Sequence, residues 1–248
     1  MTRLPVPLLS ILVFVLLWAL AAAIAGSPNT LPTPWTVARL TVAELASGEL
    51  LFHLSATLAR TIAAFVIAMA IGAAIGLWLG TDRRADAWGD PWLVGLLNLP
   101  ALVTIVLCYI WIGLTEVAAI AAVAINKIPL VATQMREGAR ALDPALRDMG
   151  RVFGLSRRAR LRHVVMPQLA PHFAASGRTG IALIWKIVLV VEFLGRSNGV
   201  GFMIHQYFQL FDVARVLVYA ISFVAVMLAV EMLILQPWQR RATRWRRS

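Results

Sequence analysis

The segment DPALRDMGRVFGLSRRARLRHVVMP, residues 143–167, is the one extended polar stretch in the interior of the chain, and long apolar runs flank it. Pro144 suits the first position of a helix after an Asp143 cap, and Gly154 can end that helix in the left-handed conformation. Apolar residues fall at helical spacing on one face, and they are Leu146, Met149, Val152 and Phe153. The sequence therefore predicts a short amphipathic helix that begins at residue 144.

A second short helix is expected directly after this one. Ser156 can cap it, its apolar positions include Leu161 and Val164, and Pro167 and Pro171 are expected to stop it. The result is a helix, a turn and a helix, exposed between two apolar spans. Such a segment has little use inside a bilayer but suits a surface that docks into another protein.

The composition is that of an integral membrane protein. The chain has 248 residues, of which 60% are hydrophobic and 14% charged, with a mean hydropathy of +0.79; in soluble domains about a quarter of the residues are charged. The net charge of +11 is explained by arginines that set membrane topology, so it does not indicate nucleic-acid binding. Cys108 is the one cysteine, which excludes an intrachain disulfide and a thiol metal cluster.

Six apolar segments are long enough to cross a bilayer, at 8–25, 54–80, 91–114, 117–135, 172–194 and 213–235. The first could instead be a cleavable signal peptide, because small residues precede Gly26; its length favours a retained span. Between the first two spans, residues 28–34 read as a proline-rich loop and residues 37–51 as a short amphipathic surface helix. The sequence therefore predicts an all-helical polytopic protein with six spans.

Two of these spans carry packing signals. Gly72, Gly76 and Gly80 recur on one helical face of the second span, which indicates close helix packing, within the subunit or in a dimer. Asn98 and Pro100 interrupt the third span. They are expected to bend it and to leave a carbonyl that a polar partner must satisfy. Residues 81–86 read as a short charged turn between the two spans.

The arginines and lysines of the loops decide the orientation. One side carries 16 of them: Arg3, Arg83 and Arg84, eight arginines between 136 and 162, and five in the tail. The other side has two, Arg39 and Arg196. By the positive-inside rule both termini and the loop at 136–171 are cytoplasmic.

The same loop resembles a known motif. Permease subunits of binding-protein-dependent ABC importers carry a cytoplasmic loop with the pattern Glu-Ala-Ala, three residues, Gly, nine residues, Ile, one residue, Leu-Pro. The residues in register here are Asp148, Met149, Gly150, Gly154, Val164, Met166 and Pro167, with both spacings intact. The acidic triplet departs from the pattern, so the glycine, hydrophobic and proline positions carry the match.

The resemblance covers the chain from about Leu50 onward and is closest to the nitrate, sulfonate, taurine and bicarbonate group. It implies the MetI-like fold of type I ABC importers and a location in the bacterial inner membrane. It also implies a homodimer, two cytoplasmic ATPase subunits and a periplasmic solute-binding protein. The loop would act as a lever that couples ATP hydrolysis to transport of a small anion, with a docking surface formed by Phe153, Leu155, Leu161 and Val164.

On this basis the expected organisation has three parts. Residues 1–56 form an N-terminal span and periplasmic loop, residues 57–236 form the permease core with the coupling loop at 136–171, and residues 237–248 form a basic cytoplasmic tail. The chain contains no phosphate-binding loop of the Gly-x-x-x-x-Gly-Lys-Ser/Thr type. It is therefore not expected to be an enzyme or to hold a cofactor, and ATP and magnesium belong to the partner ATPase. The four histidines show no metal-binding spacing.

Several ionisable residues lie within the predicted spans. Lys127 and Lys186, the only two lysines, lie about 13 Å and 21 Å from the cytoplasmic ends of their helices. With Asn98 and Glu192 they are the candidates for lining the translocation path, where the lysines would favour an anion; the alternative is a structural contact. Glu192 also matches an acidic family position just before a Gly-rich loop, which resembles a structural anchor.

Arg60, Arg178 and Glu231 are expected to snorkel toward a membrane surface or to form local ion pairs. Two other classes of function stay open at this point, an ion-coupled secondary transporter and a non-transporting scaffold or insertase. Only the importer requires a partner ATPase, so co-purification of one separates the three.

Overall fold

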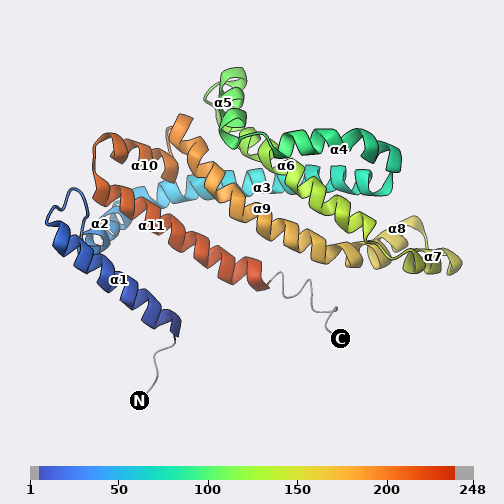
Figure 1. The fold of residues 1–248 in the computed structure, drawn as a ribbon, viewed down its shortest axis with the longest axis horizontal. Helices are drawn as coiled ribbons and strands as arrows, with labels where there is room; N and C mark the ends of the chain where they lie inside the picture. Colours follow the sequence, from blue (N-terminus) through green and yellow to red (C-terminus); the bar gives the residue numbers. More distant parts are fainter. Residues whose placement is uncertain (1–5, 238–248) are drawn as a thin grey trace, which may run out of the picture. The chain divides into compact units, whose positions relative to one another are not determined.

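The computed structural model describes residues 6–237, and every regular element among them is a helix (Figure 1). The chain folds into two compact units. One comprises Met1–Thr57 and Glu192–Met227, and the other comprises Leu58–Val191 and Leu228–Ser248. Arg3 and the predicted basic tail, from residue 238 on, lie outside the described residues.

The first unit contains α1 (Val6–Ala25), α2 (Pro34–Ala46), α10 (Val200–Gln209) and most of α11 (Val213–Val230). The predicted surface helix at 37–51 is wrong in its extent. It ends at Ala46 because Gly48 adopts the left-handed conformation, with a φ of +83°, and the next helix begins at Glu49. That helix, α3 (Glu49–Thr81), continues without a break into the second unit.

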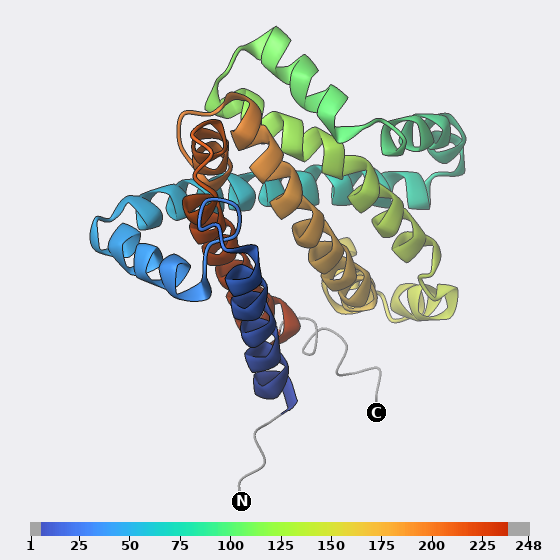
Figure 2. The ribbon, with the colours of Figure 1, turned by 60° about the vertical axis from the view of Figure 1, so that its left-hand side comes forward.

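The second unit is built around α6 (Glu116–Arg140), which packs against α3, α4 (Arg83–Leu97) and α5 (Ala101–Ile112) (Figure 2). Its other elements are α7 (Pro144–Val152), α8 (Arg157–Arg160), the π-helix η1 (Leu161–Val165), α9 (Met166–Gly195) and the π-helix η2 (Glu231–Leu235), although α9 and α11 extend into both units. Three clusters of buried apolar side chains contribute to its core.

The three glycines of α3 lie against α6, so the predicted close packing occurs within the subunit. A Cβ at Gly72 would lie 2.6 Å from the Cβ of Val131, and one at Gly80 would lie 2.7 Å from the carbonyl oxygen of Arg136. A Cβ at Gly76 would overlap the carbonyl of Ala132. Only glycine allows the two backbones to approach this closely.

The expected bend in the third span is confirmed. Helices α4 and α5 meet at 94° across the break at residues 98–100. The carbonyl that Pro100 frees is that of Leu96, and it accepts from the Leu99 N–H at 3.3 Å, while Asn98 Nδ2 donates to the carbonyl oxygen of Val94 at 2.8 Å. The charged turn predicted at 81–86 is wrong, since Asp82 accepts hydrogen bonds from the first backbone N–H groups of α4, which already begins at Arg83.

Among the described residues, three helices are long and apolar enough to cross a membrane: α3, α6 and the segment Val213–Leu235. The bent pair α4–α5 makes a fourth span if it is counted as one. The first predicted span corresponds to a shorter apolar helix, Leu9–Ala25, and the fifth lies within α9. The structure thus gives an all-helical membrane protein with three to four clear spans, while the count of six stays a prediction.

Candidate coupling loop and candidate translocation residues

The polar segment at 143–167 begins as the sequence predicts. Asp143 Oδ1 accepts a hydrogen bond from the Ala145 N–H at 2.8 Å and so caps α7. Gly154 follows that helix with a φ of +64°, in the left-handed region. Ser156 Oγ accepts from the Ala159 N–H at 3.2 Å and caps the next helix. The predicted first helix, the turn at Gly154 and the start of the second helix are therefore confirmed.

The expected stop of the second helix is wrong. The chain continues from α8 through the π-helix η1 into α9, past both Pro167 and Pro171. A proline lacks an N–H and its ring presses on the carbonyl four residues earlier. The wider turn of η1, in which the Met166 N–H bonds to the Leu161 carbonyl, relieves this clash just before Pro167. The proline motif therefore marks the start of a long helix.

The loop presents apolar side chains to the outside. Val152 is 85% exposed and Phe153 is 76% exposed, while Met149, Leu155 and Leu161 are exposed to a lesser degree. Asp148, Met166 and Pro167 are exposed as well, and Gly150 lies within α7. Val164 is buried, so it does not belong to this surface. An exposed apolar patch of this kind on a polar loop is typical of a protein contact site.

Charged side chains tie the helix before the loop to its neighbour. Arg136, near the end of α6, forms ion pairs with Asp86 at 3.3 Å and Asp90 at 2.5 Å on α4. Arg140, in the last turn of α6, pairs with the same Asp86 and with Glu137. The end of α6 from which the loop starts is therefore fixed to α4.

The four candidates for the translocation path lie in different environments. Lys127 is buried, with 7% of its surface exposed, whereas Lys186 and Asn98 are exposed. Within residues 6–237, no hydrogen bond or ion pair joins Asn98, Lys127 and Lys186. Glu192 is fully buried. The structure therefore does not gather the four at one point.

Glu192 has the contacts of an anchor for the Gly-rich loop. Its Oε2 accepts hydrogen bonds from the Thr57 hydroxyl and from the Gly201 N–H, both at 2.9 Å. A side chain at Gly199, which has a φ of +108°, would overlap this carboxylate. The interpretation of Glu192 as an anchor for the loop is confirmed by these contacts.

Sequence reasoning missed two further anchors, His53 and Thr57. Thr57 Oγ1 accepts from the Val200 N–H at 2.8 Å, and His53 Nδ1 accepts from the Gly199 N–H at 3.0 Å. The available signal was a pair of polar residues, four apart, on one face of an apolar helix. Such residues need buried partners.

The expected local ion pairs are present. Arg60 donates to Glu116 through two nitrogens, at 2.7 Å and 2.6 Å, and Arg178 lies 2.8 Å from Glu231. Arg60 is buried in the interior of α3, so its ion pair with Glu116, and not a position near a helix end, explains how a charged side chain is tolerated there.

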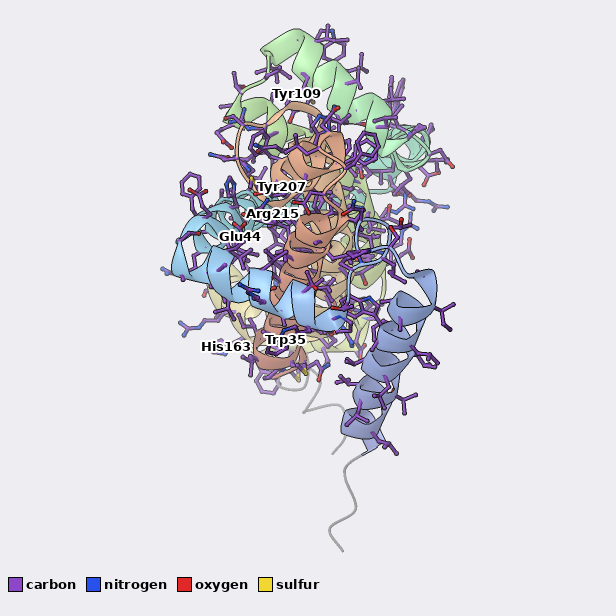
Figure 3. All side chains as sticks on the ribbon, turned by 90° about the vertical axis from the view of Figure 1, so that its left-hand side faces the viewer. Trp35, Glu44, Tyr109, His163, Tyr207 and Arg215 are labelled. Carbon is purple, nitrogen blue, oxygen red and sulfur yellow. The ribbon has the colours of Figure 1, made fainter. Side chains whose placement is uncertain are left out.

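The first unit holds a polar cluster that the sequence did not reveal (Figure 3). Arg215 contacts Glu44 at 3.2 Å and Asp212 at 3.1 Å, and its guanidinium lies over the ring of Tyr207. Burial and the nearby Glu44 carboxylate raise the pKa of Tyr207, although Arg215 opposes this, so its hydroxyl stays protonated at neutral pH.

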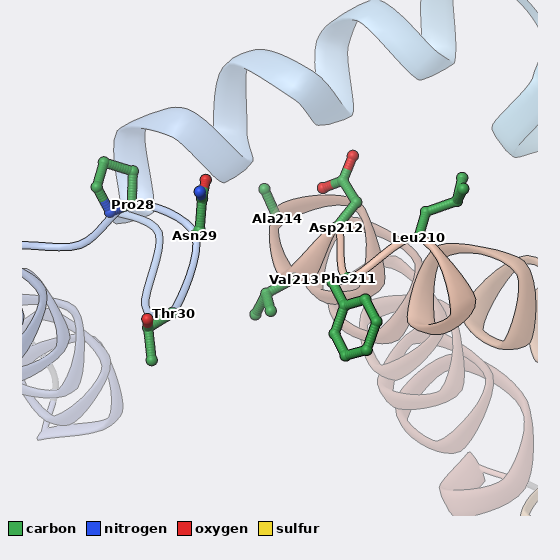
Figure 4. Close-up of a pocket in the computed structure, with 8 residues that line it drawn as sticks. All are labelled: Pro28, Asn29, Thr30, Leu210, Phe211, Asp212, Val213 and Ala214. Atoms are coloured by element: carbon green, nitrogen blue, oxygen red, sulfur yellow. The ribbon is translucent and has the colours of Figure 1, made fainter.

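Beside this cluster lies a cavity of about 600 Å³ (Figure 4). It is lined by Pro28, Asn29, Thr30 and the segment from Leu210 to Ala214.

This is a helical membrane protein in which one loop exposes a short helix, α7, and ion pairs hold the start of that loop to α4. Such an arrangement fits the class of transport subunits that work with a partner protein. Residues 68–245 match the family model described as the binding-protein-dependent transport system inner membrane component. The chain belongs to this family, the permease subunits of ABC importers.

Two relatives carry names that assign them to the transport of aliphatic sulfonates. The SsuC permease of Escherichia coli strain K12 is 33% identical over 76% of this chain and 72% of its own. SsuC of Bacillus subtilis strain 168 is 29% identical over 90% of this chain and 80% of its own. Among solved structures, the inward-facing MetNI methionine ABC transporter aligns with a TM-score of 0.68 at 16% identity, over 80% of this chain and 98% of that one. The MetI-like fold is thereby shown.

Proposed function

We propose that this chain forms the translocation path of an ATP-driven importer for a small organic anion of the sulfonate type. Taurine, nitrate and bicarbonate are the other solutes in this proposal. ATP and magnesium would be bound by two partner ATPase subunits, with no covalent chemistry in this chain. A periplasmic solute-binding protein would deliver the solute, and a second copy of this chain would complete the path.

One observation carries the proposal, the exposure of Val152 and Phe153 beside the left-handed turn at Gly154. Large apolar side chains on a cytoplasmic loop are costly unless a partner covers them. Movement of that partner would shift the end of α6, which ion pairs hold to α4, and so move the membrane-spanning helices. The names of the sulfonate relatives support the choice of solute.

The test is co-purification of the ATPase with variants of the loop. Phe153→Asp should lower the affinity for the ATPase roughly 30-fold or more, as expected for an aromatic hot spot. Phe211→Asp is the matched control, because Phe211 is 82% exposed but lies in the loop between α10 and α11, which this proposal assigns to the other membrane face. Equal ATPase recovery from wild type and from Phe153→Asp would contradict the proposal.

The translocation path is proposed to include Lys186 and Asn98, whose exposure leaves them free to face a second copy. An exposed ammonium in the middle of a span costs roughly 2.5 to 3.5 kcal/mol in lipid, so a polar path is the favourable surrounding. Lys186→Met should reduce uptake of an anionic solute by about tenfold or more, with ATPase assembly intact. Unchanged uptake, or transport of a cation, would exclude the role.

Both termini are proposed to be cytoplasmic, which places the 600 Å³ cavity on the periplasmic side. There the polar residues Asn29, Thr30 and Asp212 could contact the solute-binding protein. The exposed Phe211 provides an apolar centre for such a contact.

A further inference from the structure

The second unit contains a cavity whose lining is entirely apolar, called here the apolar cavity. Its volume is about 330 Å³. Side chains from α3, α6 and α9 line it, among them Ala73, Leu77, Met135, Met166, Leu169 and Phe173. Met166 and Phe173 are exposed in part, so the apolar cavity opens to the surface.

A second cavity, called here the polar cavity, lies one helical turn nearer to the ends of α3 and α6. Its volume is about 320 Å³, and its polar lining side chains are those of Thr81, Arg140 and Asp143. On α3, Thr81 follows Leu77 of the apolar cavity by four residues. On α6, Ala139 of the polar cavity follows Met135 by the same step. Residues four apart share a helix face, so the same two faces line both cavities.

Leu142 joins the two cavities. It lines the polar cavity, and it packs on the cluster of Met135 and Leu169, which line the apolar cavity. Along α3 the two cavities extend from Ala73 to Thr81, about 12 Å at 1.5 Å per residue. One leaflet contributes about 15 Å to the hydrocarbon core of a bilayer. The cavities together therefore match the depth of one leaflet, with the polar groups at the helix ends.

The polar cavity is lined by one cation and one anion. Arg140 pairs with Asp86 and Glu137, but 43% of its side chain is exposed, and a guanidinium has further N–H donors for a phosphate. Asp143 accepts from the Ala145 N–H and is exposed, so its carboxylate can also accept from an ammonium. The polar cavity thus complements a zwitterion better than it complements a single charge.

We propose that the two cavities bind one phospholipid with a primary ammonium head group, phosphatidylethanolamine. One acyl chain occupies the apolar cavity, the phosphate lies at Arg140 and the ammonium lies at Asp143. Water is a poor occupant of the apolar cavity, because its lining offers no polar side chain as a partner. Each methylene of an acyl chain gains free energy when it is buried there. The site does not depend on the solute or on the direction of transport.

The test is thermal unfolding of the full chain in phosphatidylcholine nanodiscs that contain a minor fraction of a second phospholipid. Phosphatidylethanolamine at about ten times its dissociation constant should raise the melting temperature by about 3 to 6 °C. Phosphatidylglycerol at the same fraction lacks the ammonium and should give no comparable rise. Equal melting temperatures with all three lipids would overturn the proposal. A rise with phosphatidylglycerol as large as with phosphatidylethanolamine would overturn it as well, since a negative charge alone would then be sufficient.

Ala73→Leu tests the apolar cavity. The larger side chain fills the cavity, so the variant should melt no lower than wild type in phosphatidylcholine alone, yet it should lose the rise with phosphatidylethanolamine. Ala74→Leu is the matched control and should keep the rise, because Ala74 is exposed and lines neither cavity. A full rise in Ala73→Leu would contradict the proposal. If Ala73→Leu instead dissociates a dimer, a second copy fills the apolar cavity and the proposal is wrong.

Asp143→Asn tests the polar cavity. Asparagine caps a helix about as well as aspartate, so α7 keeps its start while the charge that faces the ammonium is lost. The rise with phosphatidylethanolamine should be largely abolished. Asp82→Asn is the matched control, because Asp82 caps α4 in the same way and lines neither cavity, and it should keep the rise. An undiminished rise in Asp143→Asn would overturn the assignment of the head group.

Discussion

The Gly-rich loop at residues 195–201 joins α9 to α10, and the coupling loop at 143–167 lies between α6 and α9. The two loops direct their side chains and backbone groups in opposite ways. In the Gly-rich loop, the backbone N–H groups of residues 199–201 donate inward to His53, Thr57 and Glu192. In the coupling loop, the apolar side chains of α7 face outward. The first loop is therefore fixed by its own chain, whereas the second leaves apolar side chains uncovered, as the proposed contact with an ATPase requires.

The largest effect is expected where the inward bonds are broken. Glu192→Ala removes the acceptor of the Gly201 N–H and one of the two acceptors of the Thr57 hydroxyl, which keeps the His53 carbonyl at 3.1 Å. The unsatisfied Gly201 N–H costs about 1 to 3 kcal/mol, which lowers the melting temperature by about 2 to 12 °C. Thermal unfolding of the purified protein measures this.

Glu192→Gln is the control for that experiment, because it retains one acceptor oxygen in nearly the same volume. Its melting temperature should lie between those of wild type and Glu192→Ala. An alanine variant that melts like wild type would show that the Gly-rich loop does not depend on this anchor.

A smaller effect on stability, but a clear effect on function, is expected at the turn of the coupling loop. Gly154→Val meets open space, so its cost is only that of a β-branched residue at a φ of +64°, about 1 to 2 kcal/mol. The variant should insert, while uptake falls and the solute-binding protein no longer stimulates ATP hydrolysis. Gly95→Val is the matched control, since Gly95 also meets open space but lies within α4 without a positive φ. Normal stimulation in Gly154→Val would contradict a coupling role.

The sequence predicted correctly those features that are determined by a few neighbouring residues. The cap at Asp143, the turn at Gly154 and the bend at Asn98 each arise within a few residues, and all three are confirmed. The helix end predicted at Pro167 is wrong, because the π-helix before it accommodates the proline, and that π-helix depends on the whole helix. The partners of α3 were also hidden, since Thr57 lies 135 residues from Glu192.

The candidate residues of the translocation path show the same contrast between what the sequence predicts and what only the folded chain reveals. Charge and depth in the bilayer singled out both lysines, but only the folded chain separates the buried Lys127 from the exposed Lys186. Their difference comes from which face of a helix packs, and the apolar pattern of these spans does not mark that face because both faces are hydrophobic.

The smallest perturbation tests whether the two loops lie on opposite sides of the membrane. Ser156, in the coupling loop, and Ser197, in the Gly-rich loop, are both exposed. Cysteine at either position, in a Cys108→Ala background, should leave stability within about 0.5 kcal/mol of the background protein. In intact cells a membrane-impermeant thiol reagent should label position 197 only, and permeabilised cells should expose position 156 as a positive control. The expected pattern follows from the 16 to two distribution of arginines among the loops and tails. If position 156 were labelled from outside, no cytoplasmic ATPase could reach Phe153, and the loop with the outward apolar face would need a different partner.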